Sequence, residues 1–247
     1  MVRFVDSRER EKEILNLVIE SYIDESKPIS SSYLCQKYNL SCSSATIRNV
    51  MVSLERQGFL SHVHTSSGRV PTKDGFKCYV RSLTEEDYIK DYAVDIVAYL
   101  QRISEAGQVV NNMLDILAQM SGYTSMVAIS GKDTKIFFKG TRFMLEQPEF
   151  EDIKMLKALF FAFETKMDEF QEVLFRYLDD GVNILIGDDI GVEEISECSL
   201  VVSGLRREPV TCAFGLLGPV RMNYVRAASC LNAVNGQFNE LIAELVV

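Results

Sequence analysis

The sequence predicts an α+β protein with a small N-terminal domain of helices and one β-hairpin, a long helical segment, and a second domain of strands and helices. Before residue 58, apolar residues recur three times at helical spacing. A short alternating strand pattern with a glycine-containing turn follows, and short β-rich runs alternate with helical stretches after residue 122. We therefore expect domains at residues 1–83, 84–121 and 122–247.

The first two expected helices lie before residue 39. Residues 7–24 carry apolar side chains at helical spacing. Pro28 then interrupts the chain, and a short second helix is expected over residues 32–38, with Ser30 or Ser31 as its N-cap.

The third expected helix follows a turn at residues 39–42. It begins at Ser43 or Ser44 and ends at Gly58, which suits a left-handed C-cap. Its buried stripe would consist of Ile47, Met51 and Leu54. Three helices in this order predict a helix-turn-helix.

The opposite face of the third helix is polar. The residues expected there are Ala45, Thr46, Arg48, Asn49 and Ser53. Arginine can pair with guanine and asparagine with adenine in a major groove, and hydroxyl groups bond phosphates or base edges. In an isolated helix the same pattern would more often be a solvated surface, so the neighbouring sequence has to decide.

That neighbouring sequence predicts a β-wing. Residues 59–64 alternate as a strand, residues 65–69 form a turn-rich tip, and a return strand begins at Val70. Gly68 would permit close approach to the sugar-phosphate backbone, and Arg69 would enter a minor groove. The chain then passes from residues 71–75 into 76–83, with no helix assigned there.

Charge separates the N-terminal domain from the rest. Residues 1–83 hold twelve Lys/Arg and nine Asp/Glu, whereas residues 84–247 hold fourteen and twenty-six. Within residues 26–83, eight basic residues face only two acids, Glu55 and Asp74. A basic surface on an acidic protein is expected of a DNA-binding module. The side chains expected at that interface are Ser31, Ser44, Ala45, Thr46, Arg48, Asn49, Ser53, His64, Thr65, Ser66, Gly68, Arg69, Thr72, Lys73 and Lys77.

Other chemistry finds little support. His62 and His64 share a strand face but lack a third ligand nearby, so we expect no metal. We find no nucleophile with a base, no paired carboxylates and no phosphate loop, and therefore expect neither catalysis nor a cofactor. The six scattered cysteines are expected to be buried thiols, and the absence of a leader or an apolar run of about 20 residues predicts a cytoplasmic protein without membrane contact.

Several strings resemble the heat-inducible transcription repressor family HrcA. They are SSATIRN at residues 43–49, HTSSGRVPT at 64–72, LEQPEF at 145–150 and GLLGPVRMNY at 215–224. The resemblance implies a winged-helix repressor of chaperone operons that binds an inverted-repeat operator, called CIRCE, as a homodimer. It also implies a GAF-like domain, a dimerising insertion within it, and a chaperonin that acts as corepressor.

The sequence departs from this family in its middle. The strand at residues 126–130 leads through 131–134 straight into 135–139, where the family has a long further stretch. A reduced GAF-like α+β domain without the inserted segment is therefore expected, and the family's mode of dimerisation is open. Ser32 replaces a usual basic residue, and Ser67 replaces a usual alanine.

The helical segment offers another way to form a dimer. Its heptad seam comprises Ile96, Tyr99, Ile103, Ala106, Val110, Met113, Leu117 and Met120. This seam favours a coiled coil with a second chain or, equally, packing onto the following sheet or an intramolecular helical bundle.

The C-terminal domain is expected to alternate strands and helices. Strands are predicted at residues 123–130, 135–140, 182–187, 199–203 and 212–217, and helices at 151–165, 169–178 and 222–245. Two alternatives to a chaperone-operon repressor stay open. One is a regulator gated by a small ligand in the GAF-like domain, and the other is an enzyme fused to a winged helix that contacts proteins.

Overall fold

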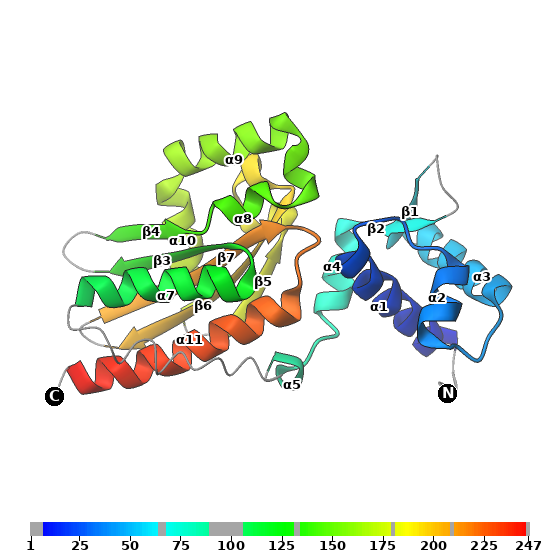
Figure 1. Cartoon of the computed structure of the whole chain (residues 1–247), viewed down its shortest axis with the longest axis horizontal. Coiled ribbons are helices and arrows are strands. Elements are labelled where there is room, and N and C mark those ends of the chain that lie inside the picture. The colour runs from blue at the N-terminus through cyan, green and yellow to red at the C-terminus, as the bar shows by residue number, and fades with distance from the viewer. Residues whose placement is uncertain are drawn as a thin grey trace. The chain divides into compact units, whose positions relative to one another are not determined.

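A computed structural model of the chain describes residues 7–63, 68–88, 106–130, 134–178, 181–207 and 210–245. The chain divides into two units, Met1–Leu83 and Thr84–Val247, which are described separately (Figure 1). Helices together with a five-stranded antiparallel sheet confirm the predicted α+β class. Among the helices of the described ranges, none has the length and apolar content needed to cross a bilayer.

Three helices build the core of the first unit. They are α1 (Ser7–Glu25), α2 (Ser31–Tyr38) and α3 (Ser44–Arg56), close to the predicted bounds. The side chains that they bury most fully are Ile14, Leu15, Val18, Ile19, Leu34, Ile47 and Leu54. These positions recur at helical spacing, so one apolar stripe of each helix faces the others.

A small hairpin follows the third helix. Its strands β1 (Leu60–His62) and β2 (Arg69–Pro71) pair in antiparallel fashion. Helix α4 (Lys73–Val80) comes next, where the sequence pattern had indicated no helix. Because glycine is a poor helix former, Gly75 weakens the helical signal in this part of the sequence. In the structure a glycine is needed at this position, since a Cβ there would lie 2.2 Å from the carbonyl oxygen of Phe59.

The second unit is built on one antiparallel sheet with the strand order β4-β3-β7-β6-β5. The strands are β3 (Thr124–Ser130), β4 (Lys135–Lys139), β5 (Val182–Ile186), β6 (Cys198–Arg207) and β7 (Val210–Pro219). All five coincide with strands predicted from the sequence, and β6 and β7 are longer than predicted.

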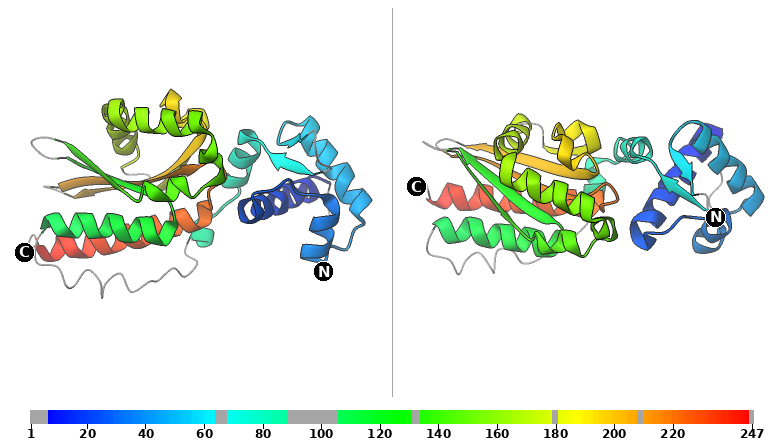
Figure 2. Two further views of the ribbon diagram at one scale, coloured as in Figure 1. Left: turned by 45° about the horizontal axis from the view of Figure 1, so that its top comes forward. Right: turned by 90° about the horizontal axis from the view of Figure 1, so that it is seen from above.

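Helices cover both faces of this sheet (Figure 2). Helices α7 (Ala106–Ser121) and α11 (Tyr224–Leu245) lie on one face, with the short α5 (Glu85–Tyr88) against α11. Helices α8 (Arg142–Leu145), α9 (Ile153–Thr165) and α10 (Met167–Arg176) lie on the other. Single 3-10 turns are η1 (Pro148–Glu151), η2 (Gly187–Ile190) and η3 (Glu193–Ile195).

Successive side chains of each strand point to opposite faces of the sheet and contact the helices on both sides. Met126 and Leu200 belong to the apolar core shared with α9 and α10. On the opposite face, the Ser125 hydroxyl donates to the carbonyl oxygen of Leu114 at 2.7 Å, and Ser199 bonds the Tyr224 hydroxyl at 2.9 Å. The sheet faces are thus occupied by the chain's own side chains.

The described part of the heptad seam is used within the chain. Met113 and Leu117 are fully buried, and α7 contacts β3, β4 and α11. These contacts, with the sheet and with another helix of the same chain, correspond to the predicted intramolecular uses of the seam. Residues 92–105 of the seam lie outside the described residues, so the coiled coil stays a prediction.

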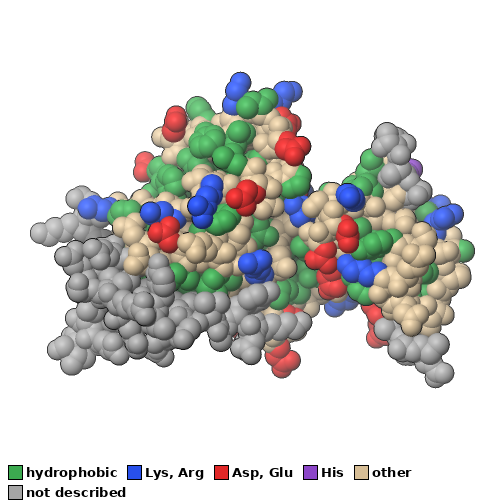
Figure 3. Space-filling model, in the orientation of Figure 1, with side chains coloured by type: hydrophobic (Ala, Val, Ile, Leu, Met, Phe, Trp, Pro, Cys, Tyr) green, Lys and Arg blue, Asp and Glu red, His purple; other side chains and the backbone are tan. Residues whose placement is uncertain are grey.

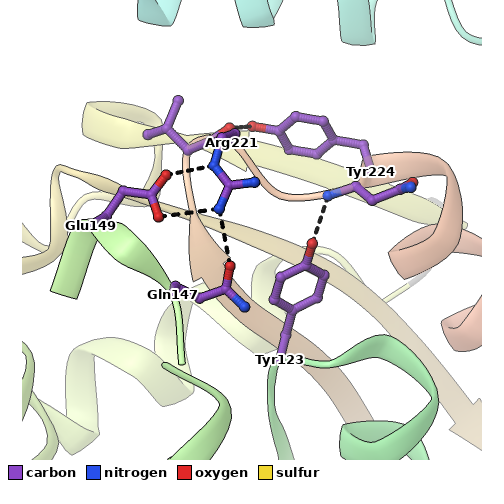
Figure 4. A network of polar contacts seen from close by, with 7 residues as sticks. Tyr123, Gln147, Glu149, Arg221 and Tyr224 are labelled. Atoms are coloured by element: carbon purple, nitrogen blue, oxygen red, sulfur yellow. Dashed lines mark hydrogen bonds and ion pairs between the residues drawn. The ribbon is translucent and has the colours of Figure 1, made fainter. Parts of the chain in front are cut away.

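A polar network joins two distant segments of the second unit (Figure 4). The Arg221 guanidinium donates to Glu149 Oε1 at 2.7 Å and to Gln147 Oε1 at 3.2 Å. Nearby, the Tyr123 hydroxyl accepts from the backbone N–H of Asn223 at 2.7 Å. The network holds the turn between β7 and α11 against η1 and its N-cap residue Gln147.

We predict that Cys212 and Cys230 resist alkylation in the native protein. Burial raises the pKa of each thiol to about 11, so little reactive thiolate is present at pH 8. Peptide mass spectrometry after brief iodoacetamide treatment measures this, with half-buried Cys78 as the internal comparison. Alkylation of Cys212 as fast as Cys78 would contradict the buried placement.

Candidate nucleic-acid interface

Local sequence fixes where α3 begins and ends. The Ser43 hydroxyl accepts from the backbone N–H of Thr46 at 3.2 Å, which is an N-cap bond. At the other end Gly58 adopts a φ of +83°, and its N–H donates to the carbonyl oxygen of Glu55 at 3.0 Å. The helix is therefore held at both ends by the residues that the sequence indicates.

The exposed face of α3 is narrower than predicted. Ser44, Ala45, Arg48 and Asn49 are exposed, whereas Ile47, Met51 and Leu54 form the buried stripe. Thr46 is half-buried, and its hydroxyl lies 3.0 Å from the capping hydroxyl of Ser43. The side chains that α3 offers to a partner are concentrated in its first half.

Ser53 serves another purpose. Its hydroxyl donates to Glu11 Oε1 on α1 at 2.7 Å, and the Gln57 amide donates to the other carboxylate oxygen at 3.2 Å. These two hydrogen bonds lower the pKa of Glu11. Ser53 thus fastens the back of α3 to α1.

Arg69 is held inside the first unit. Its Nε donates to Glu55 Oε2 at 2.8 Å, and its side chain is 14% exposed. Its backbone N–H and C=O both bond Ile29 at 2.8 Å, which joins β2 to the loop before α2. This placement differs from the expectation that Arg69 reaches into a minor groove.

Three more predicted residues have structural contacts. Ser31 is buried at 5% exposure. A Cβ on Gly68 would lie 2.7 Å from the backbone of Pro28, so packing against the chain itself requires this glycine. The Thr72 hydroxyl caps α4 by accepting from Gly75 N–H and donates to the carbonyl oxygen of Gly58 at 2.6 Å. These residues shape the hairpin from inside.

The remaining predicted residues belong to the hairpin tip and to α4. Lys73 and Lys77 are half-buried, four residues apart on α4. His64, Thr65 and Ser66 lie outside the described residues.

The basic residues of the first unit are unequally available. Besides Arg69, Lys37 is engaged: its ammonium group donates to Asp24 Oδ2 at 3.1 Å. Burial lowers the pKa of Lys37, but its hydrogen bonds to Asp24 and Tyr33 raise the pKa by more. Lys27, Arg48, Arg56 and Arg81 are exposed. Arg48 alone among these four lies on the exposed first half of α3.

The second unit contains a polar hollow of about 440 Å³ beside α7 and α8. Its lining residues are Asp115, Ala118, Gln119, Gly140, Thr141, Arg142 and Phe143. Across the part of the chain that the structure describes, no three His, Cys, Asp or Glu side chains come together as metal ligands would.

Comparison with known proteins assigns the chain to a family. Residues 100–227 match the family model described as "HrcA protein C terminal domain". The chain is 24% identical to the "Heat-inducible transcription repressor HrcA" of Symbiobacterium thermophilum, over 94% of this chain and 98% of the relative. The protein of the same name from Chlorobium chlorochromatii is 33% identical, over 71% of this chain and 51% of the relative.

The class of protein is therefore a transcription repressor and not an enzyme. The chain belongs to the HrcA family, whose members named above are heat-inducible repressors, so the predicted resemblance is confirmed. The aligned length with the Symbiobacterium relative is 334 positions, more than the 247 residues of this chain. That relative consequently contains residues without a counterpart here.

One solved structure shares the fold. It is described as "Crystal structure of a hypothetical protein at 2.2 A resolution", and it matches with a TM-score of 0.77 over 94% of this chain and 97% of that chain. The sequence identity is 15%, so this likeness concerns the fold alone.

The sequence did not indicate the structural roles of two carboxylates, Glu55 and Glu11. Glu55 is one of only two acids among residues 26–83, and this isolation within a basic segment is a signal that it has a partner. Glu11 gives no such signal because it lies among several acids of α1. Its partner Ser53 is 42 residues away, a separation that no local pattern spans.

We predict that Ser53→Ala destabilises the protein in a pH-dependent way. The lowered pKa of Glu11 in the folded state stabilises the protein above the ordinary glutamate pKa, and this contribution is lost as pH falls through the lowered value. The difference in free energy of unfolding between wild type and Ser53→Ala should therefore shrink from about pH 5 to pH 3. Urea unfolding followed by circular dichroism measures it.

Ser44→Ala is the matched control, because Ser44 is exposed on the same helix. Its effect should not change over this pH range. An equal pH dependence for both variants would show that the Glu11 bond is not the cause.

Proposed function

We propose that residues 1–83 form a winged helix-turn-helix domain that binds operator DNA. Helix α3 would enter the major groove, and the β1–β2 hairpin would be the wing beside it. The observation that carries this proposal is the exposed surface of α3, which presents Arg48 and Asn49 outside its buried stripe. The excess of basic residues in this unit supports attraction to phosphate.

Arg48 and Asn49 are suited to base edges. Both are exposed and adjacent, and α3 is anchored at its N-cap and to α1, so their starting positions are fixed before DNA is met. A guanidinium pairs with guanine and a carboxamide with adenine. The exposed Ser44 hydroxyl, one turn earlier, is placed for a phosphate.

We further propose that two copies bind an inverted repeat of the CIRCE type and repress chaperone genes. Two copies related by twofold symmetry would bring two α3 helices to half-sites separated by whole turns of the duplex. The family membership supports this assignment. In a chain shorter than its relatives, the contacts between copies have to come from the residues that remain.

We predict that Arg48→Ala weakens operator binding by about 1–3 kcal/mol and lowers the preference for operator over random duplex. The reason is the loss of a base contact in addition to one positive charge. Fluorescence anisotropy on DNA from upstream of the protein's own gene, against a scrambled duplex, measures both affinities.

Arg56→Ala is the matched control, since it removes an exposed arginine from the opposite end of α3. It should weaken both duplexes alike. If Arg48→Ala also weakened both alike, α3 would not be the element that selects the sequence.

The second unit is proposed to be a reduced GAF-like domain that receives the chaperonin as corepressor. Its exposed large apolar side chains lie on β4, α8 and α9, and Figure 3 shows apolar surface over α9. They are Phe137, Phe138, Leu145, Ile153, Phe160 and Phe161. Exposed apolar patches of this kind mark sites of protein interaction, and chaperonins bind apolar surface.

We predict that the Phe160→Ser, Phe161→Ser double variant loses its response to chaperonin. Both rings are about half exposed, at 44% and 52%, so their removal should change stability little. Purified chaperonin should raise operator occupancy by the wild type in a filter-binding assay and leave the variant's occupancy unchanged.

A Lys157→Ser, Glu164→Ser variant provides the control, because it changes two exposed residues of α9 without altering net charge. It should respond to chaperonin like the wild type. A full response from the phenylalanine variant would remove this surface from consideration.

A further inference from the structure

The ion pair between Glu55 and Arg69 connects α3 to the hairpin. We propose that Glu55 is a positioning residue, which sets the hairpin against α3 through Arg69, and that DNA binding requires both side chains for this pairing and not for a contact with DNA. The inference rests on the proposed function of the first unit. Neither residue would touch the operator.

Arg69 joins three parts of the first unit at one point. Its backbone bonds Ile29 in the loop before α2, and it pairs with His62 in the register of the hairpin. Its guanidinium reaches Glu55 at 2.8 Å, the carbonyl oxygen of Gly68 at 3.3 Å and His62 Nδ1 at 3.2 Å. Because a guanidinium only donates, His62 Nδ1 is the acceptor in this bond.

The pair between Glu55 and Arg69 is largely shielded from solvent. The Arg69 side chain is 14% exposed and that of Glu55 is 32% exposed. To enter a groove, Arg69 would have to give up the bonds to Glu55, Gly68 and His62 together. Keeping the internal pair with Glu55 is therefore more favourable for Arg69 than entering a groove.

The hairpin needs such a tie. Each of its strands has three residues, and a two-stranded hairpin of this size has little stability of its own. Its orientation must come from contacts with the rest of the unit. Glu55 supplies one of these from the last turns of α3, the same helix that carries Arg48.

Because of the position of Glu55, a positioning role and simple electrostatics predict opposite changes in DNA affinity when its carboxylate is removed. Glu55 follows Arg48 by seven residues, which is about two helical turns and places both on the same side of α3. By simple electrostatics, removal of a carboxylate from this side should strengthen binding to a polyanion. A positioning role requires the opposite result.

The experiment compares full-length wild type, Glu55→Gln and Arg69→Lys on DNA from upstream of the protein's own gene, at a temperature where circular dichroism finds each folded. Glu55→Gln should lower operator affinity about tenfold, within the range of coupling between residues in contact. Arg69→Lys keeps the charge beside Glu55 and should lose less. The matched control Glu9→Gln removes an exposed carboxylate of α1 and should bind as tightly as wild type or more tightly.

A positioning role also predicts which DNA contacts change. Hydroxyl-radical protection at the edges of each half-site, where the hairpin would lie, should be lost in Glu55→Gln. Methylation interference at guanines within the half-site, where α3 would lie, should be retained. Loss of both signals in parallel would mean that Glu55 merely supports the fold, and would overturn the proposal.

A double-mutant cycle separates pairing from direct DNA contact. If pairing is the function of both residues, Glu55→Gln with Arg69→Gln should lose no more affinity than either change alone. A further loss on adding Arg69→Gln would show that Arg69 touches DNA, and binding by Glu55→Gln as tight as by Glu9→Gln would also refute the positioning role. Failure of the wild type to bind the operator would instead refute the proposed function.

Discussion

Burial of Ile47, Met51 and Leu54 decides which side of α3 faces outward. These side chains are at most 3% exposed, so α3 cannot rotate about its axis without bringing apolar surface into water. The face with Arg48 and Asn49 is then fixed as the outer one. The N-cap bond at Ser43 and the bond from Ser53 to Glu11 stabilise this same orientation of α3.

The first unit also shows that a basic residue in a basic segment need not be a DNA contact. Arg69 and Lys37 both pair with acids of the same unit, at 2.8 Å and 3.1 Å. Their charges shape the unit and contribute to its field, whereas their hydrogen-bond donors are engaged internally. Specific contacts are therefore more reasonably sought at exposed cations such as Arg48 than in the total charge.

The second unit has a different organisation. Its sheet is covered on both faces by helices of the same chain, and the Arg221–Glu149 pair fixes the turn before α11 to η1. Two of the strings that resemble the family, 145–150 and 215–224, meet in this network. Their joint occurrence in the sequence thus has a physical basis, since each supplies one half of the same ion pair.

The sequence by itself determined the first three helices, the five strands, the family and the exposed position of Arg48, because repeat spacing, caps and short strings are local properties. Tertiary structure alone decided the rest. Helix α4 contains Gly75 because its backbone lies so close to Phe59 that no side chain would fit between them. Arg69 turns inward because Glu55, fourteen residues earlier in the sequence, lies beside it in space. Such contacts join residues that are distant in the sequence, and the spacing of residues along the chain does not predict them.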